Sequence, residues 1–233
     1  AEADLSQGED RIVKAMIASM LPAGPRREEL LWRARAQPWE NDEHWRAATI
    51  IFGVTPETGT KEQRYQAKRV RHASNYDMHG KRLSEELSKD GITITPDEGQ
   101  RMIEAVVDHD IPELRDWQSE IRKRLLRDRK LTNDWGRELL FTYDRLDEDA
   151  FRRGYAFIPQ SSLATILNQW GMRPLDAAIQ RGEFRAAINI NNHDSLLVSV
   201  HPDDVWPVWQ FLRSSLERPR TYWGVELTIP VGL

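Results

Sequence analysis

Apolar residues recur at helical spacing over most of this sequence. The clearest case is the segment 112–130, where four large apolar side chains fall on one stripe of a helix. Another helix begins with a capping signal, because Thr95 is followed by Pro96 at the first helical position and by Glu98 at the third. Pro159 predicts a kink inside a further helical segment. The pattern predicts helices over 11–20, 27–37, 42–52, 60–75, 81–89, 112–130, 147–170 and 203–216, and one that starts at 96.

Strand-like segments are fewer and shorter. The runs 184–190 and 196–200 are rich in β-branched and apolar residues, and they flank the tight sequence 191–195 (NNHDS). Two such runs around a short polar sequence predict a hairpin, with His193 and Asp194 at its tip. Further strands are predicted at 2–7, 136–143 and 225–231.

The composition is typical of a packed globular chain. Of its 233 residues, 39% are hydrophobic and nine are Trp, which is more than a disordered tail contains. The absence of Cys excludes disulfides and thiolate metal sites. No apolar run approaches the roughly 18 residues that span a bilayer, and the N-terminal residues lack the features of a secretory signal. We therefore expect a cytoplasmic protein with no membrane partner.

The charge distribution along the chain is uneven. The net charge of −4 by itself disfavours a nucleic-acid binder. Residues 61–72, however, carry five Lys or Arg and one Glu, and residues 121–130 carry six Lys or Arg and one Asp. Each run is either an ordinary solvated helix face or a surface that binds phosphates, and the charges alone leave both interpretations open.

Two features of the sequence could carry phosphate chemistry. Asp4 lies on the first predicted strand and Asp194 at the hairpin tip. Carboxylates on adjacent strands can hold two Mg²⁺ ions about 3.5–4 Å apart for phosphoryl transfer, although most Asp residues at strand ends form turns or caps. The second feature is a row of side chains at successive i, i+4 steps, each about 6 Å along the helix axis, which can follow an extended triphosphate. This row consists of Arg64, Lys68, His72 and Tyr76.

Seven short motifs occur in order along nearly the whole chain. Three of them are residues 4–11 (DLSQGEDR), the basic segment 64–78, and residues 193–195 (HDS). They resemble motif A (DYSQIELR), motif B (RRxxKxxxFGxxYGM) and motif C (HDE) of the family A, or polymerase I-like, DNA polymerases. The others are similar to the family's DIH segment before FGV, its FP.VR start of a long helix, its GRRR strand, and its R..N.P.Q helix with one residue deleted. These four lie at 42–54, 111–115, 136–137 and 153–160.

The resemblance implies a template-directed DNA polymerase that uses two Mg²⁺ ions. Asp4 and Asp194 would bind the ions together with the backbone carbonyl of Leu5, and Lys68 would join the two aspartates as a catalytic residue. Glu9 would exclude ribose at the 2′ carbon, and Tyr76 would stack at the templating position. The implied nucleotide-binding residues are Leu5, Gln7, Glu9, His44, Arg64, Lys68, His72 and Tyr76, and the implied DNA-binding residues are Arg137, Arg153, Gln160 and His193.

The resemblance also implies a fold and partners. The expected fold class is α+β, with an antiparallel palm sheet built from residues 1–38 and 134–233 and a helical fingers subdomain at 39–133. Primer-template DNA and deoxynucleoside triphosphates are the implied partners, in a prokaryotic or viral replication system. Relatives place a thumb, part of the palm and often an exonuclease domain before motif A. We therefore expect an N-terminal segment of this kind as a separate or cleaved chain.

The chain departs from the family pattern at several motif positions. His72 stands at the family's Phe, Asp77 at a Gly, Gly8 at a bulky aliphatic and Ser195 at the motif C Glu, and smaller departures are Tyr65 and Ala73. These departures imply a divergent branch, viral or plasmid-borne, and leave a second function open: a catalytically impaired relative that serves as a DNA-binding or assembly module. A single-subunit RNA polymerase is a third interpretation, which Glu9 disfavours.

Overall fold

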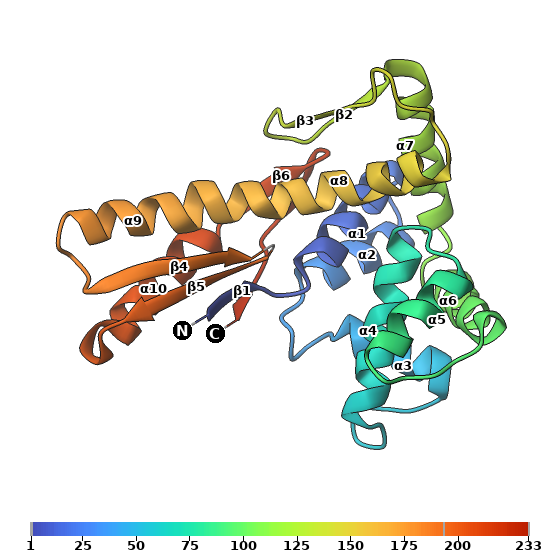
Figure 1. Ribbon diagram of the computed structural model, residues 1–233, viewed down its shortest axis with the longest axis horizontal. Coiled ribbons are helices and arrows are strands. Elements are labelled where there is room, and N and C mark those ends of the chain that lie inside the picture. Colours follow the sequence, from blue (N-terminus) through green and yellow to red (C-terminus); the bar gives the residue numbers. More distant parts are fainter. Residues whose placement is uncertain (1, 193, 233) are drawn as a thin grey trace. The chain divides into compact units, whose positions relative to one another are not determined.

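The computed structural model describes residues 2–192 and 194–232, and it consists of helices and antiparallel strands (Figure 1). The chain forms two compact units. One of them, the sheet unit, contains the residues up to Gln37, Thr132–Glu138 and the residues from Phe157 on. The other, the helical unit, contains Pro38–Leu131 and Leu139–Ala156. The expected α+β fold class is confirmed.

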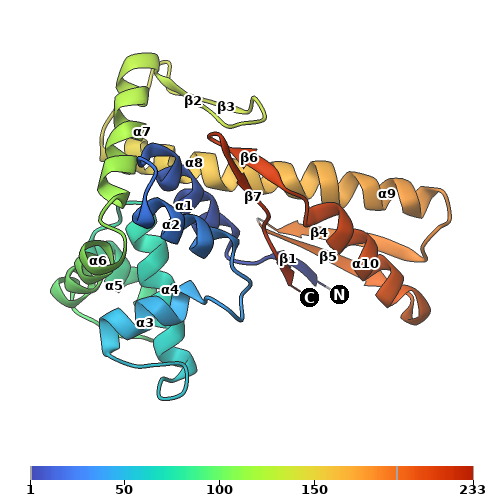
Figure 2. The same ribbon diagram turned by 180° about the vertical axis from the view of Figure 1, so that it is seen from behind.

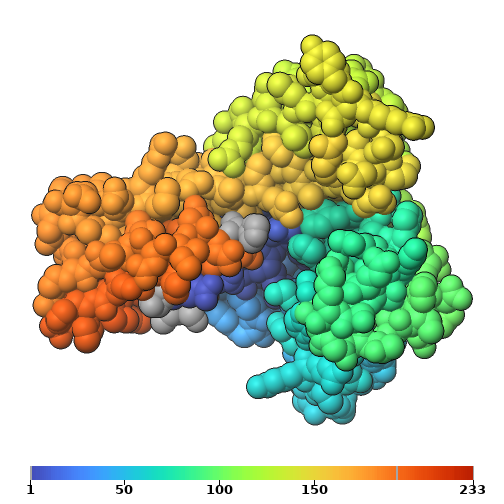
Figure 3. All heavy atoms as spheres, viewed as in Figure 1, coloured from blue at the N-terminus to red at the C-terminus, as the bar shows by residue number. Residues whose placement is uncertain are grey.

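A four-stranded antiparallel sheet forms the centre of the sheet unit. Its strand order is β4-β5-β1-β8 (Figures 1 and 2). The predicted hairpin is present as β4 (Ala186–Asn192) and β5 (Ser195–Val200), and β1 (Glu2–Leu5) lies between β5 and β8 (Val231–Gly232). β1 and β5 are therefore inner strands, whereas β4 is an edge strand that lies at the surface of the unit (Figure 3).

Helices pack on this sheet and on one another. The helix α8 (Glu148–Ile166) continues at its C-terminal end into a π-helix, η1 (Leu167–Met172), which packs on β5. The next helix, α9 (Arg173–Gln180), packs on β4. Buried aliphatic residues of α1, η1 and β5 form much of the core, because apolar surface is stabilised when it is removed from water. The other elements of the unit are α1 (Gly8–Met20), α2 (Pro25–Arg35), α9 (Arg173–Gln180), η2 (Pro202–Asp204), α10 (Val205–Leu216), β6 (Arg220–Tyr222) and β7 (Val225–Leu227).

The helical unit is built from helices with strong local start signals. The capping box predicted at Thr95 and Glu98 is present, and Thr60 with Gln63 forms a second one. The apolar stripe of α7 is fully buried and includes Trp117. The elements are α3 (Glu43–Phe52), α4 (Lys61–Asn75), α5 (Gly80–Lys89), α6 (Pro96–Asp110), α7 (Leu114–Asp128) and the first part of α8 (Glu148–Ile166). The hairpin of β2 (Lys130–Thr132) and β3 (Glu138–Leu140) is divided between the two units, because its tip, Thr132–Glu138, belongs to the sheet unit.

Several sequence predictions differ from the structure. The helix predicted over 147–170 is present as α8, which contains Pro159, but it ends at Ile166 and continues as the π-helix η1. The predicted last strand is divided into β7 and β8, and the predicted strand at 136–143 is reduced to the three residues of β3. Segment 139–156 clusters with the helical unit, although it falls in the predicted range 134–233. The reason is packing: Gly154 lies so close to α7 that a Cβ there would be 2.6 Å from Leu125 Cδ1.

No helix within the described ranges combines the length and the apolar character that a bilayer-spanning segment requires.

Candidate functional site

The sheet brings the two predicted catalytic aspartates together. In the register, Asp4 of β1 lies opposite Ser195, the residue that follows Asp194. The backbone amide of Leu5 donates a hydrogen bond of 2.9 Å to the carbonyl oxygen of Asp194. Opposite residues of an antiparallel pair have Cα atoms about 4.5–5.5 Å apart, so Asp4 and Asp194 are neighbours at the centre of the sheet. Both are half-buried.

The turn after β1 is fixed by backbone hydrogen bonds and one buried arginine. Gln7 has the left-handed conformation, with φ 52° and ψ 30°, and α1 begins at the next residue. Arg11 is buried, and its Nε donates to the carbonyl of Ser6 at 2.8 Å while Nη1 donates to the carbonyls of Ala34 and Ala36 at 2.7 Å. These bonds join the turn to the end of α2. The conformation of Gln7 is costly for a residue with a side chain, and Arg11 helps to hold it.

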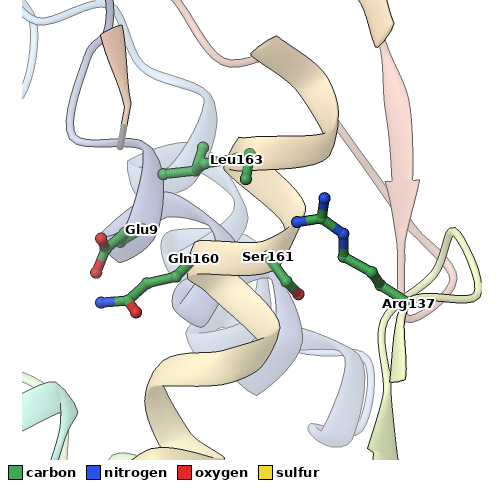
Figure 4. Close-up of a pocket in the computed structure, with 6 residues that line it drawn as sticks. Glu9, Arg137, Gln160, Ser161 and Leu163 are labelled. Carbon is green, nitrogen blue, oxygen red and sulfur yellow. The ribbon is translucent and has the colours of Figure 1, made fainter. Parts of the chain in front are cut away.

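The first turn of α1 places Glu9 at a cavity of about 240 Å³ (Figure 4). The side chains of Glu9 and Gln160 lie next to one another, and Arg137 lies across α8 from them (Figure 4). The cavity is lined by Glu9, Arg137, Gln160, Ser161, Leu163 and Ala164, and we call it the Glu9 cavity. The structure thus brings together three of the residues that the sequence predicted for nucleotide and DNA binding.

The pKa of the Glu9 carboxyl is raised to about 7. Burial is the largest cause, and the negative charge of Asp194 is the second; a hydrogen bond from Gln160 acts in the opposite direction. The nearby charge of Asp10 raises the pKa further. The carboxyls of Glu9 and Asp194 therefore lie close enough to repel one another when both are ionised, and a cation bound near them would offset this repulsion.

Gly8 explains how α8 comes so close to α1. A Cβ at this position would lie 2.6 Å from Leu163 Cδ2, so the side chain of Leu163 takes the space that a larger residue would fill. This packing brings Gln160, on the preceding turn of α8, to Glu9. The departure from the family pattern at Gly8 is therefore matched by Leu163 on the facing helix.

The donor set beside the sheet fits magnesium that is shared with a phosphate substrate. Mg²⁺ is commonly held by one or two protein carboxylates, with water and substrate phosphates completing its six ligands. Asp4 of β1 and Asp194, the residue directly before β5, provide two neighbouring carboxylates. In the described ranges no group of three or more His, Asp or Glu side chains is arranged to hold a metal alone. The predicted ligand set, with the Leu5 carbonyl, stays a prediction, and His193 lies outside the described residues.

Ser195 stands at the position of the motif C glutamate, and it contacts another carboxylate. Its hydroxyl donates a hydrogen bond of 2.6 Å to Glu2 Oε1. Ser195 is buried, whereas Glu2 is exposed. A carboxylate from β1 therefore lies beside the buried hydroxyl, one residue from Asp194.

In the helical unit, Asp42 joins the predicted phosphate-binding residues of two helices. Its Oδ1 accepts hydrogen bonds from the backbone amides of His44 at 2.9 Å and Trp45 at 3.3 Å, which caps α3. Its Oδ2 accepts from Nε and Nη2 of Arg64 at 3.0 and 2.7 Å. His44 Nδ1 lies 3.8 Å from Oδ1. One carboxylate thereby places His44 beside Arg64.

The remaining predicted residues of α4 follow Arg64 along the helix. Lys68 and His72 are exposed, and Tyr76 is buried at the C-terminal end. The rings of His72 and Tyr76 make an edge-to-face contact with centroids 4.9 Å apart. Tyr76 also lines a cavity of about 460 Å³ together with Met78, His79, Arg82, Asp149 and Arg152.

Three of the four predicted DNA-binding residues lie in the described ranges, two in the sheet unit and one in the helical unit. Arg137 and Gln160 line the Glu9 cavity in the sheet unit. Arg153 belongs to the helical unit, where its Nη2 lies 2.7 Å from Asp144 Oδ1 and its guanidinium lies 4.9 Å from the centroid of the Phe141 ring. His193 is the fourth, and it is outside the described residues.

Sequence reasoning missed Asp42, Arg11 and Leu163 as residues that position the site. The signal for Asp42 was present, because an Asp directly before an amphipathic segment is a strong cap. Nothing in the sequence indicated its second bond, since Arg64 lies on another helix. The contact of Leu163 with Gly8 likewise depends on the packing of two helices that are distant in sequence.

Comparisons with known proteins identify the family of the chain and a structure of similar fold. Residues 3–233 match the model of a protein family described as DNA polymerase family A. No curated protein sequence matches significantly. Among solved structures, the chain is similar to one described as "POL domain of Pol1 from M. smegmatis complex with DNA primer-template and dNTP", with a TM-score of 0.74 and 24% sequence identity. The match covers 99% of this chain and 38% of that chain, and at this identity the likeness shows the fold alone.

Proposed function

Because the chain belongs to DNA polymerase family A, we propose that it catalyses template-directed DNA synthesis. The reaction is attack of a primer 3′-hydroxyl on the α-phosphorus of a deoxynucleoside triphosphate, which forms the new phosphodiester bond and releases pyrophosphate. The observation that carries this proposal is that Asp4 of the inner strand β1 lies next to Asp194, the residue that directly precedes β5, beside the Glu9 cavity. Such a reaction is accelerated mainly by positioning and by neutralising charge.

The aspartate pair is the proposed metal site. Two Mg²⁺ ions bound there would lower the pKa of the primer hydroxyl and would neutralise charge on the leaving pyrophosphate. Asp4 and Asp194 hold the ions, with the carbonyl of Leu5 as a further ligand. The hydrogen bond between the Leu5 amide and the Asp194 carbonyl supports this proposal, because it joins the backbones that carry the two carboxylates.

Residues of α3 and α4 bind the triphosphate in this proposal. Arg64 uses Nε and Nη2 for Asp42, and a guanidinium has five N–H donors, so others remain for phosphate oxygens. Lys68, one turn further on, is exposed and acts as the catalytic cation on the transferred phosphates. Asp42 holds His44 beside Arg64, and in this proposal His44 contacts the same triphosphate.

The sugar, the bases and the duplex contact other residues. Glu9, half-buried at its cavity, excludes a ribose 2′-hydroxyl, and Gln7 lies beside it in the turn. His72 contacts the sugar, and Tyr76 stacks at the templating position. Arg137, Gln160, Arg153 and His193 contact the primer-template through phosphates and minor-groove acceptors, which positions DNA without reading its sequence.

We infer that the sheet unit is the palm and that the helical unit is the fingers. The neighbour of similar fold is much longer than the part that this chain matches. We propose that an N-terminal segment with a thumb, on a separate or cleaved chain, completes the enzyme in a prokaryotic or viral replication system. Without thumb contacts to phosphates, affinity for duplex DNA would be low and would fall steeply with salt. A stable monomer that extends primers processively at physiological salt would exclude this partner.

A catalytically impaired relative that binds DNA is the second candidate function. The departures at His72, Asp77 and Ser195 favour it, whereas Asp4, Asp194 and Lys68 favour the polymerase. Primer extension with Mg²⁺, using wild type and the Asp194→Asn variant in parallel, decides between them. Metal-dependent extension that the variant lacks supports the polymerase. DNA binding without extension by either protein, also in the presence of the N-terminal segment, supports the second candidate.

A further inference from the structure

A buried cluster of charges joins three helices of the helical unit. Arg71 of α4 is 2% exposed, Glu43 of α3 is 2% exposed and Asp110 of α6 is 1% exposed. The guanidinium of Arg71 donates to Glu43 Oε2 from Nη2 at 2.7 Å and to Asp110 Oδ2 from Nη1 at 2.5 Å. Arg46 of α3 donates from Nε to Asp110 Oδ1 at 2.5 Å. Arg46 is exposed, so the buried part of the cluster is Arg71 with the carboxylates of Glu43 and Asp110.

Such a cluster contributes little net stability to a fold, because burying charges has a large desolvation penalty. Removing each charge from water costs several kcal/mol, and apolar residues of similar size often give equal or greater stability. The cluster instead fixes the relative positions of the helices, because the planar guanidinium of Arg71 donates to two carboxylates in fixed directions. A shift of α3 along α4 would break these bonds and leave charges buried without partners.

The cluster lies directly behind the proposed triphosphate site. Glu43 is the residue between Asp42 and His44, and Arg71 is two helical turns beyond Arg64. The start of α3 is thus joined to α4 by two ion pairs, one at the surface between Asp42 and Arg64 and one buried between Glu43 and Arg71. The two attachment points are adjacent residues at the start of α3 and seven residues, or about 10 Å, apart on α4, so the pairs fix the position of the start of α3 along α4.

We propose that Glu43 and Arg71 are positioning residues for the nucleotide: their buried ion pair sets α3 on α4 so that His44, Arg64 and Lys68 face the same triphosphate. This inference rests on the proposed function, and it extends that function to residues that touch no substrate. Groups that bind a substrate must keep their places to within about 0.5 Å, and a buried ion pair with two attachment points provides that precision.

The test replaces the ion pair with apolar residues of similar volume. In the double variant Glu43→Ile/Arg71→Met, Asp110 keeps its bond to Arg46, so the fold is expected to survive. Thermal unfolding reports the fold. Equilibrium binding of dATP with Mg²⁺, of inorganic tripolyphosphate and of deoxyadenosine reports the site. We expect the affinities for dATP and tripolyphosphate to fall about tenfold or more, equivalent to about 1.4 kcal/mol, with little change for deoxyadenosine.

Two further variants keep the inference falsifiable if the double variant unfolds. Arg71→Lys retains a buried cation but loses the fork, so it should fold and should also weaken tripolyphosphate binding. Arg69→Met is the matched control, because Arg69 lies on the same helix and forms an exposed ion pair with Asp90 at 2.7 Å. This control should bind both phosphate ligands like wild type.

The possible results separate the inference from the function. A folded double variant or Arg71→Lys variant that binds tripolyphosphate within twofold of wild type would overturn the positioning role and leave the polymerase proposal standing. An equal loss in the Arg69→Met control would also overturn it. Wild-type protein that binds neither dATP nor tripolyphosphate would remove the proposed function, and the inference with it. In primer extension, a raised KM for dATP with a smaller change in kcat supports the inference.

Discussion

The backbone amide of Leu5 donates a hydrogen bond of 2.9 Å to the carbonyl of Asp194. This bond joins the residue after Asp4 to the tip of the β4–β5 hairpin, so two carboxylate-bearing residues that are 190 positions apart in the sequence become neighbours. Both side chains depend on the same sheet hydrogen bonds for their separation. The aspartate pair should therefore respond to substitution as one site.

Asp4→Asn and Asp194→Asn should each abolish nucleotide incorporation and leave the fold and DNA binding nearly intact. Loss of one carboxylate removes the charge that holds a divalent cation, and several kcal/mol of barrier correspond to a loss of at least about a hundredfold. Primer extension with Mg²⁺ measures the effect. The control is Asp203→Asn, an exposed carboxylate of the same unit. Incorporation by either aspartate variant above about a hundredth of wild type would contradict the assignment.

Lys68→Ala should lower the rate of nucleotide use strongly, whereas Arg64→Ala should mainly raise the KM for the nucleotide. Lys68 is exposed on α4, and Arg64 is already shared with Asp42, so the two cations contribute differently. Steady-state kinetics with varied dNTP separate the two effects. Arg69→Ala, on the same helix but bonded to Asp90, is the control. If the Lys68 and Arg64 variants lose DNA affinity equally and keep their nucleotide dependence, α4 binds the duplex instead.

Glu9→Ala should increase incorporation of ribonucleotides relative to deoxynucleotides. Glu9 lies at a cavity of about 240 Å³, and truncation opens space where a 2′-hydroxyl would be excluded. Competition between a ribonucleotide and its deoxy counterpart in single-nucleotide extension measures the discrimination. Unchanged discrimination, with normal incorporation of deoxynucleotides, would exclude Glu9 from this role.

Glu9→Gln should stabilise the metal-free chain more at pH 8 than at pH 5. The pKa of Glu9 is raised to about 7 by burial and by Asp194, so the folded state binds this proton more tightly than the unfolded state does. The stability from the protonated group is therefore present below the usual pKa and is lost as the pH rises through about 7. A Gln side chain does not titrate, so the variant lacks this pH-dependent loss of folding stability, which is on the order of 2 kcal/mol. Urea unfolding at both pH values measures the difference. A gain that does not depend on pH would contradict the shift.

Asp77→Ala should destabilise the chain by about 1 kcal/mol more than Asp77→Gly does. Asp77 has φ 54°, a conformation that Gly adopts without strain, and its Oδ2 lies 3.0 Å from Arg122 Nη2. Both variants lose the ion pair, so the difference between them isolates the backbone. Urea unfolding gives the two free energies. Equal stability of the variants would mean that the backbone strain at Asp77 is relieved after substitution.

Local sequence determined most of the helices and the order of the motifs. The start of α6 at Pro96 followed from Thr95 and Glu98, whose capping box is complete within four residues. The buried stripe of α7 followed from the spacing of its apolar residues. The hairpin followed from two β-branched runs around a short polar sequence. These predictions succeeded because each interaction joins residues that are close in the chain, and such signals can be read without knowing the fold.

Tertiary structure decided which of these residues meet. The sequence contains Glu43, Arg71 and Asp110, but only the packing of three helices makes them one buried cluster. Gly8 and Leu163 match because α8 lies against α1, and Gly154 places the start of α8 against α7, in the helical unit. Contacts of this kind join residues far apart in sequence, so their cost in chain entropy and desolvation is met only when the whole core forms. The sequence alone contains these residues, but it does not show which of them contact one another.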